Sequence, residues 1–224
     1  MKPRIIFWIY VGTSLANLVG QLVSSEDLER YTKPLLMPLL LFYVYKSSIG
    51  NTTLKVILLS VALLFSWLGD VVLMFQANET YFILGIGLFL IAQVTYILVL
   101  RKSTYRKAEL NLTKIVPFLI YGAILFYVLL PAGDFTVPII VYGIVILVMM
   151  INASMRKGHT SERSYQLAFL GSILFVLSDS VLAVNAFKEP VPYAGFFIMS
   201  TYCAAQYLLV EGILAHENSA NPRT

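Results

Sequence analysis

Eight long apolar segments, separated by short polar stretches, constrain the fold of this chain more than any other feature. In chain order they cover residues 5–23, 33–46, 55–76, 80–100, 114–131, 136–154, 165–187 and 192–214. Most of them approach the ~20 residues that a helix needs to cross the hydrocarbon core of a bilayer. Only 12% of the residues are charged, well below the ~25% usual in a soluble domain. The sequence therefore predicts an all-α membrane protein with eight transmembrane helices.

The first two segments depart from a plain transmembrane pattern. The second is short and begins KPLLMP, so Pro34 and Pro38 are expected to kink or tilt its start. The first follows a basic start, as in a secretory signal peptide, but no small-x-small cleavage site comes after it. We therefore expect the first segment to remain in the protein as a helix.

Positive charge sets the expected orientation. If the N-terminus lies inside, thirteen Lys and Arg residues fall on the inner side, and only Arg30, Lys33 and Lys188 fall on the outer side. This asymmetry follows the positive-inside rule and supports an even number of spans. Both termini are predicted to be cytoplasmic, with one transmembrane domain over 1–215 and a short, disordered polar tail over 216–224. The protein would be multi-pass, in the inner (cell) membrane of a bacterium or the endoplasmic reticulum of a eukaryote.

Several classes of protein are disfavoured by composition. The pI is near 9.1, but the basic residues cluster in loops between apolar runs, so nucleic-acid binding is not predicted. The only cysteine, Cys203, lies in an apolar segment, and His159 and His216 lie outside the predicted spans. No disulfide, metal site or cofactor is therefore predicted, and no oligomeric state is assigned.

Two aspartates stand in the middle of apolar runs, Asp70 in LGDVVLMF and Asp179 in LSDSVLAV. A carboxylate at membrane depth costs at least a few kcal/mol, so it normally faces a bundle interior or a wet cavity. The two fall in parallel segments and at similar depth, which suggests a repeat of two four-helix halves. The alternative is a structural role, in which each aspartate only bonds to a neighbouring helix.

Other polar side chains fall at similar depths and are candidates for binding a substrate. Gln93 and Tyr96 are three residues apart, and Tyr202 and Gln206 are four apart, so each pair shares a helical face. The full set of candidates is Lys33, Gln93, Tyr96, Tyr142, Asn152, Ser178, Tyr202 and Gln206. The alternatives are hydrogen bonds between helices for the amides and a snorkelling side chain for Lys33.

Two carboxyl groups that face one cavity suggest acid–base chemistry without a metal, because repulsion and burial leave one protonated and the other ionised. A proton-coupled transporter uses intramembrane carboxylates equally well, and a lipid-binding scaffold is a third alternative. The pattern of residues alone does not rank the enzyme above the transporter.

The motifs KPLLMP, LGDVVLMF, AQVTY, GSILFVLSDSVLAVNAF and TYCAAQYLL resemble the YhhN-like lysoplasmalogenase family of eight-span membrane proteins over nearly the whole chain. The resemblance implies hydrolysis of the vinyl-ether bond of lysoplasmalogens to a fatty aldehyde and glycerophosphocholine or glycerophosphoethanolamine. It maps the two intramembrane aspartates of the family onto Asp70 and Asp179. Gln93 stands where animal relatives commonly have histidine, which argues against an essential base at that position.

This activity fits the acid–base pattern of the residues. A vinyl ether is hydrolysed by protonation of its β-carbon, which gives an oxocarbenium ion that water attacks, in parallel with glycosidase chemistry. We expect one aspartate, Asp179, to be the acid and Asp70 to stabilise the cation and activate water. A lysophospholipid would enter sideways from the bilayer, with Lys33 and the tyrosines holding its phosphate or glycerol hydroxyls.

Overall fold

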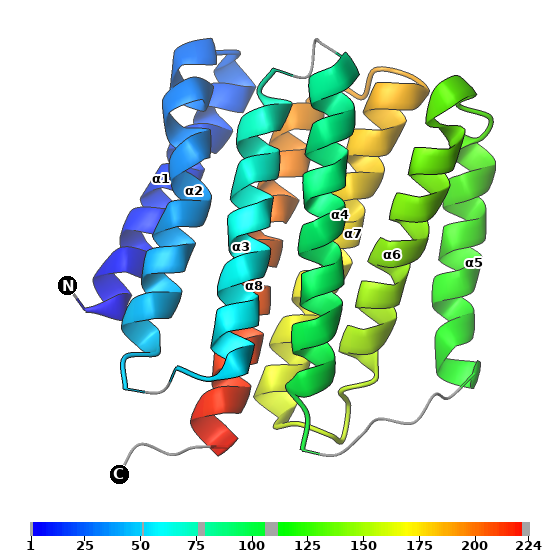
Figure 1. Ribbon diagram of the computed structural model, residues 1–224. Coiled ribbons are helices and arrows are strands. Elements are labelled where there is room, and N and C mark those ends of the chain that lie inside the picture. Colours follow the sequence, from blue (N-terminus) through cyan, green and yellow to red (C-terminus); the bar gives the residue numbers. More distant parts are fainter. Residues whose placement is uncertain (1, 51, 76–78, 106–111, 221–224) are drawn as a thin grey trace.

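The computed structural model of the chain describes residues 2–50, 52–75, 79–105 and 112–220. Within these ranges the chain is helical, without a β-strand, and eight α-helices stand side by side as a bundle (Figure 1). The helices are α1 Pro3–Val23, α2 Glu26–Ser47, α3 Leu54–Leu73, α4 Glu79–Lys102, α5 Leu112–Leu129, α6 Thr136–Ser154, α7 Glu162–Phe187 and α8 Ala194–Ala220. The predicted all-α class is confirmed.

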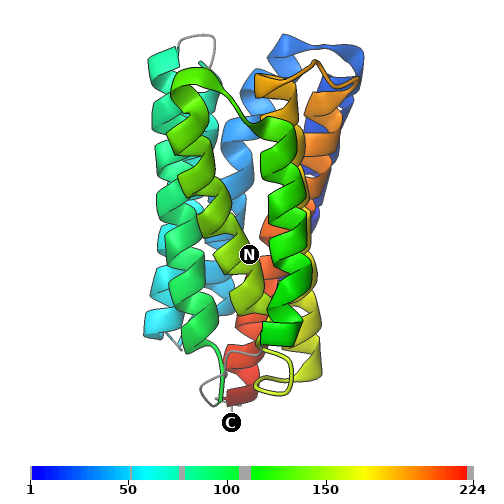
Figure 2. The same ribbon diagram turned by 90° about the vertical axis from the view of Figure 1, so that its right-hand side faces the viewer.

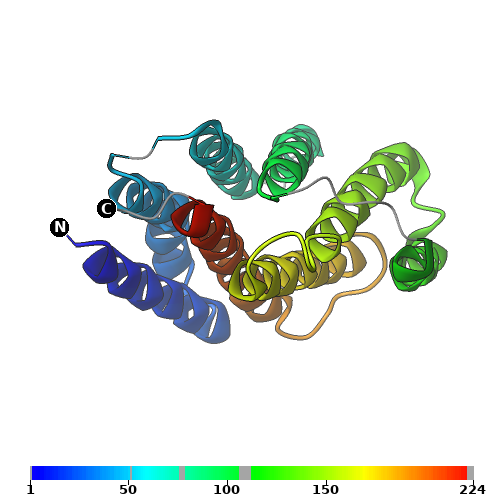
Figure 3. The same cartoon turned by 90° about the horizontal axis from the view of Figure 1, so that it is seen from below.

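Consecutive helices run in opposite directions, so the bundle has two distinct ends (Figure 1). We call the end that holds the α1–α2, α3–α4, α5–α6 and α7–α8 connections the upper end, and the opposite end, toward which both termini lie, the lower end. α5 stands at the periphery and contacts only α6 and α7 closely (Figure 3). Seen from that side, α5 and α6 lie in front of the other helices (Figure 2).

By length and composition, six helices of the described residues are long and apolar enough to cross a membrane: α1, α3, α4, α6, α7 and α8. This makes the chain a multi-pass membrane protein, but it does not confirm the predicted count of eight spans. α2 begins with charged residues and contains two prolines, and the apolar part of α5, Ile115–Leu129, is shorter than a full span.

The predicted start of the second segment, residue 33, is wrong, because α2 begins at Glu26. Ser25 caps the helix by accepting a hydrogen bond from the Leu28 N–H, and acidic residues in the first turn favour the positive end of the helix dipole. The apolar pattern begins later than the helix because that first turn is charged.

α2 also continues through Pro34 and Pro38. Pro38 has no N–H, so the carbonyl of Pro34 loses its normal partner within the helix. The indole N–H of Trp67, on α3, donates to that carbonyl at 2.9 Å. A side chain from the neighbouring helix thus satisfies a backbone group that the proline leaves open.

Glycines allow α3 and α4 to approach each other closely beside Asp70. A Cβ at Gly69 would lie 2.6 Å from the Phe89 ring, and one at Gly85 would lie 2.5 Å from Leu73. Each glycine therefore receives a large side chain of the other helix. α7 and α8 pack still closer, since a Cβ at Gly212 would meet the backbone of Ala168 at 2.6 Å.

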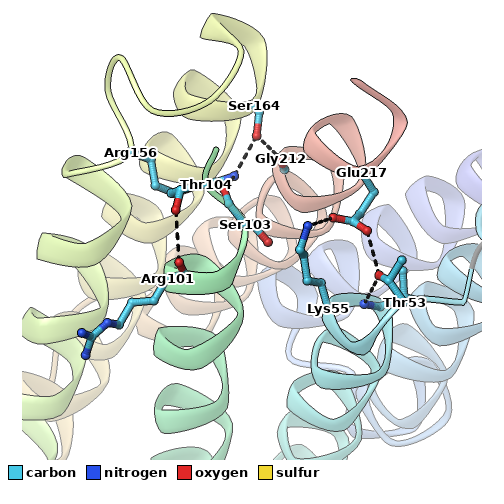
Figure 4. A network of polar contacts seen from close by, with 10 residues as sticks. Thr53, Lys55, Arg101, Ser103, Thr104, Arg156, Ser164, Gly212 and Glu217 are labelled. Atoms are coloured by element: carbon cyan, nitrogen blue, oxygen red, sulfur yellow. Dashed lines mark hydrogen bonds and ion pairs between the residues drawn. The ribbon is translucent and has the colours of Figure 1, made fainter. Parts of the chain in front are cut away.

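The lower end is held by a network of polar contacts, in which α8 reaches further than expected (Figure 4). Glu217 is only 2% exposed, and its carboxylate accepts from Lys55 Nζ at 2.7 Å and from Thr53 Oγ1 at 2.7 Å. His216 is buried beside it. The predicted boundary of the polar tail at 216 is therefore wrong, because α8 continues to Ala220; residues 221–224 lie outside the described part.

Arg156 forms the second half of this network. Its Nη2 donates to Ser164 Oγ at 2.8 Å and to the Ser103 carbonyl at 3.1 Å, and Ser164 Oγ donates to the Gly212 carbonyl at 2.5 Å. Burial lowers the pKa of Arg156 to about 10, so the guanidinium stays charged at neutral pH. The contacts tie α4, α7 and α8 to the loop after α6.

Candidate active site

A cavity of about 230 Å³ lies among the helices in the upper half of the bundle. Side chains or backbone from all eight helices line it. A water molecule takes up about 30 Å³ in the liquid, so the cavity has room for part of a lipid and several waters. Both intramembrane aspartates, Asp70 and Asp179, line this one cavity.

Asp70 lies three residues before the end of α3 and is 3% exposed. The Tyr202 hydroxyl of α8 donates to its Oδ2 at 2.7 Å. The Phe89 ring packs edge-on against the Tyr202 ring, with centroids 5.9 Å apart. The same Phe89 ring fills the space beside Gly69, so the glycine before Asp70 helps to position the phenol that bonds to it.

Asp179 lies in the upper half of α7, eight residues before its end, and is partly buried. The Tyr142 hydroxyl of α6 donates to its Oδ2 at 2.5 Å. One residue further on, the Ser180 hydroxyl bonds to the Tyr121 hydroxyl of α5 at 2.8 Å. Each aspartate therefore has a phenol on one oxygen, but the two phenols come from different neighbouring helices.

A second polar layer lies deeper in the bundle, below the cavity. The Tyr96 hydroxyl of α4 donates to Gln206 Oε1 of α8 at 2.5 Å, and both residues are fully buried. Gln206 is one helical turn from Tyr202, which links this layer to Asp70. Gln93 is also fully buried, and neither atom of its amide completes a hydrogen bond within the described part of the chain.

The structure brings some of the predicted binding residues to the cavity and not others. Lys33, Tyr142, Ser178 and Tyr202 line it, and the Ser178 hydroxyl also donates to the Ile198 carbonyl at 3.1 Å. The other four predicted residues do not line it; they are Gln93, Tyr96, Asn152 and Gln206.

Asn152 is a predicted binding residue that lies well below the cavity. It stands ten residues after Tyr142 on α6, which is about 15 Å toward the lower end at the helical rise per residue. Its Nδ2 donates to the Val148 carbonyl of its own helix at 2.7 Å. This local bond satisfies the amide without a substrate.

Three polar residues of the cavity were not singled out from the sequence: Gln21 of α1, Glu29 of α2 and Ser180 of α7. Glu29 is four residues before Lys33, so the two side chains share a face of α2. This spacing is the feature of the sequence that could have identified Glu29 as a cavity residue. Gln21 sits against Gly195, whose missing side chain leaves it room. Gln21 and Glu29 lie close to the α1–α2 connection and therefore at the upper end of the cavity.

The opposite wall of the cavity is apolar and comes largely from α5 and α6. It includes Leu125, Phe126, Leu129 and Ile139. The Phe126 ring fills the space beside Gly143 of α6, at 2.6 Å from where a Cβ would stand. Since α5 is the peripheral helix, this wall lies between the cavity and the outer surface of the bundle on that side.

The arrangement is suited to proton transfer on an amphipathic molecule. It offers two carboxyl groups with phenol partners, a cation, and an apolar wall in one cavity. Among the described residues, no group of three or more His, Cys, Asp or Glu side chains lies close enough to hold a metal ion. Two carboxyl groups with hydrogen-bonding partners in one cavity can act as a general acid and a general base.

The fold and the cavity define a multi-pass helical membrane protein with a carboxylate-bearing site between its helices. Residues 28–213 match the family model of the YhhN family. The chain therefore belongs to this family. No solved structure matches the chain.

Several curated relatives carry the name lysoplasmalogenase. Lysoplasmalogenase TMEM86B of Homo sapiens is 31% identical over 68% of this chain and 61% of its own length. Lysoplasmalogenase TMEM86A of Bos taurus is 32% identical over 66% of this chain and 62% of its own. Lysoplasmalogenase TMEM86B of Rattus norvegicus is 27% identical over 92% of this chain and 84% of its own. The alignments with the human and bovine proteins thus span about three fifths of those relatives.

Proposed function

We propose that the protein hydrolyses the vinyl-ether bond of lysoplasmalogens, releasing a fatty aldehyde and a glycerophospho-alcohol. The observation that carries this proposal is the pair Asp70 and Asp179, each bonded to a phenol and both lining one cavity between membrane helices. The names of the relatives support the substrate class.

In the proposed reaction, Asp179 is the general acid. Its proton forms a C–H bond at the β-carbon of the vinyl ether, and the π electrons leave an oxocarbenium ion at the carbon attached to oxygen. The charge of Lys33 acts on Asp70 in the same cavity. We therefore assign the negative charge to Asp70, where it faces the developing cation.

The remaining steps return both carboxyl groups to their starting states. Asp70 takes a proton from the water that adds to the cationic carbon, which gives a hemiacetal. Asp70 then gives this proton to the departing glycerol oxygen as the C–O bond breaks, while the Asp179 carboxylate takes the proton of the hemiacetal hydroxyl. The products are the aldehyde and the free glycerol hydroxyl, and one water has been consumed.

The tyrosines act on the charge of the carboxylates. The Tyr142 bond to Asp179 becomes charge-assisted when Asp179 gives up its proton, so it stabilises the state after protonation more than the state before. The Tyr202 bond holds Asp70 in place and offsets part of the cost of keeping its charge away from water.

The membrane supplies the substrate laterally. We propose that all eight helices cross the bilayer as two halves, α1–α4 and α5–α8, with both termini in the cytoplasm. The distribution of Lys and Arg supports this orientation. The cavity would then lie at the depth of the outer leaflet, and the alkenyl chain would pack on the apolar wall of α5 and α6. Reporter fusions at both termini test the topology; an external reporter at either end would contradict it.

The decisive test uses purified protein with alkenyl, alkyl and acyl lysolipids of the same chain length, and mass spectrometry of the products. Aldehyde is expected from the alkenyl lipid alone. Asp70→Asn and Asp179→Asn are expected to abolish turnover, because each removes a proton donor or a negative charge, while leaving a folded protein. Full activity in either variant would refute the acid–base assignment. Uptake of substrate into proteoliposomes without aldehyde would instead identify a transporter.

A further inference from the structure

The upper end of the cavity carries a pair of opposite charges, and neither of these side chains takes part in the proposed proton transfers. Glu29 and Lys33 stand one turn apart on α2, and both line the cavity. Such a pair on a helix surface commonly forms an ion pair. Here neither side chain has an ionic partner within 4.0 Å among the described residues, where the two ion pairs found are Lys55–Glu217 and Arg163–Glu211.

We propose that Glu29 and Lys33 form a head-group site that recognises a phosphate joined to an ammonium group. The proposal rests on the function proposed above and names the part of the lysolipid that these residues bind. Lys33 contacts the phosphate, and Glu29 contacts the ammonium of a phosphoethanolamine or phosphocholine.

The order of the charges along α2 fits this orientation of the substrate. α2 begins at the upper end, so Lys33 lies about 6 Å deeper than Glu29 at the helical rise per residue. In a lysolipid the ammonium is outermost, the phosphate follows, and the glycerol with its vinyl ether comes next. A phosphate at Lys33 therefore directs the vinyl ether toward Asp70 and Asp179 and the chain toward the α5 wall.

The acidic residues beside Glu29 have a simpler role. Glu26 and Asp27 occupy the same first turn of α2, are exposed, and do not line the cavity. They are placed to favour the helix dipole. Glu29 is instead partly buried and faces the cavity, which Gln21 of α1 also lines as a further hydrogen-bonding group.

Binding of lipids that cannot be cleaved tests the site independently of turnover. Saturated alkyl lysolipids carry the same glycerol and chain but no vinyl ether. Three of them are compared in nanodiscs: one with phosphoethanolamine, one with phosphate alone, and one with a free glycerol hydroxyl. The unmodified protein is expected to bind the first at least tenfold more tightly than the second, and the third most weakly.

Glu29→Gln is expected to remove the preference for phosphoethanolamine over phosphate, and Lys33→Gln to weaken binding of both phosphate-bearing lipids at least tenfold. Glu26→Gln and Arg30→Gln are the matched controls, because they remove one negative and one positive charge from exposed residues of the same helix. Both should leave all three affinities unchanged. Equal effects of Glu29→Gln on all three lipids, or none, would overturn the head-group assignment. If the protein shows the expected head-group selectivity but releases no aldehyde from alkenyl lipids, the hydrolysis proposal is refuted and the head-group site is not.

Discussion

The bond between Tyr142 and Asp179 gives the sharpest test of the proposed mechanism. Tyr142→Phe removes one hydroxyl and keeps the ring, so the packing of α6 on α7 is preserved. The lost bond is 2.5 Å long in the resting site. If Asp179 donates the proton, this bond is between two neutral groups before the step and reaches a carboxylate after it.

The expected size of the effect follows from that change of charge. A hydrogen bond between neutral groups contributes about 1 kcal/mol, and one to a charged group about 1.5–3 kcal/mol. The difference, about 0.5–2 kcal/mol, is the additional stabilisation that the bond gives once Asp179 is ionised. At 1.36 kcal/mol per tenfold change in rate, kcat is expected to fall about 2- to 30-fold. KM should change little, because the phenol does not need to contact the substrate.

The assay is steady-state release of aldehyde in detergent micelles, with thermal unfolding measured on the same samples. Tyr121→Phe is the matched control, since it also removes one phenolic hydroxyl that takes part in a hydrogen bond. The partner of the Tyr121 hydroxyl, at 2.8 Å, is the Ser180 hydroxyl and not a carboxylate. A purely structural role for Tyr142 would lower the unfolding temperature and leave kcat near that of Tyr121→Phe. That result would refute the assignment of Asp179 as the acid.

Two further substitutions test how the scaffold positions the site. Trp67→Phe leaves the Pro34 carbonyl without a donor and should cost about 1–2 kcal/mol of stability, seen as a lower thermal midpoint in micelles; an unchanged midpoint would contradict the role of the indole. Gly69→Ala places a Cβ 2.6 Å from the Phe89 ring, so it should cost about 1–3 kcal/mol and lower kcat by displacing the ring that packs on Tyr202. The double variant Gly69→Ala with Phe89→Leu should recover activity, because the smaller side chain makes room for the new Cβ. If kcat does not recover, the contact with Phe89 is not the cause of the lower kcat.

The pair of buried aspartates could be predicted because a carboxylate is costly at membrane depth whatever surrounds it. Asp70 and Asp179 therefore stood out from the sequence, and their shared cavity is what that cost leads one to expect. Depth alone does not give the direction in which a side chain points around its helix. Tyr142 and Asn152 both looked suitable by depth, yet only Tyr142 reaches the cavity, while Asn152 bonds to its own helix.

Residues at the ends of segments were harder to interpret for a different reason. A charged residue next to an apolar run is normally solvated, and so Glu29 did not stand out from the sequence as a cavity residue. Glu217 was assigned to a polar tail, although Thr53 and Lys55, more than 160 residues earlier in the chain, hold it in place. Partners so distant in sequence leave no periodic pattern, and only the packing of α3 against α8 brings them together.

The two aspartates look alike in sequence but their surroundings differ, as the two proposed roles require. Asp70 receives its phenol from α8, in the other half of the chain, and shares its side of the cavity with Lys33. Asp179 receives its phenol from α6, in its own half, and the adjacent Ser180 bonds to the peripheral helix α5. A strictly symmetric repeat would give both carboxyl groups the same preference for a proton, and neither would be fixed as donor or base. Placing the cation on one side only is the simplest way for two similar motifs to form an acid and its ionised counterpart.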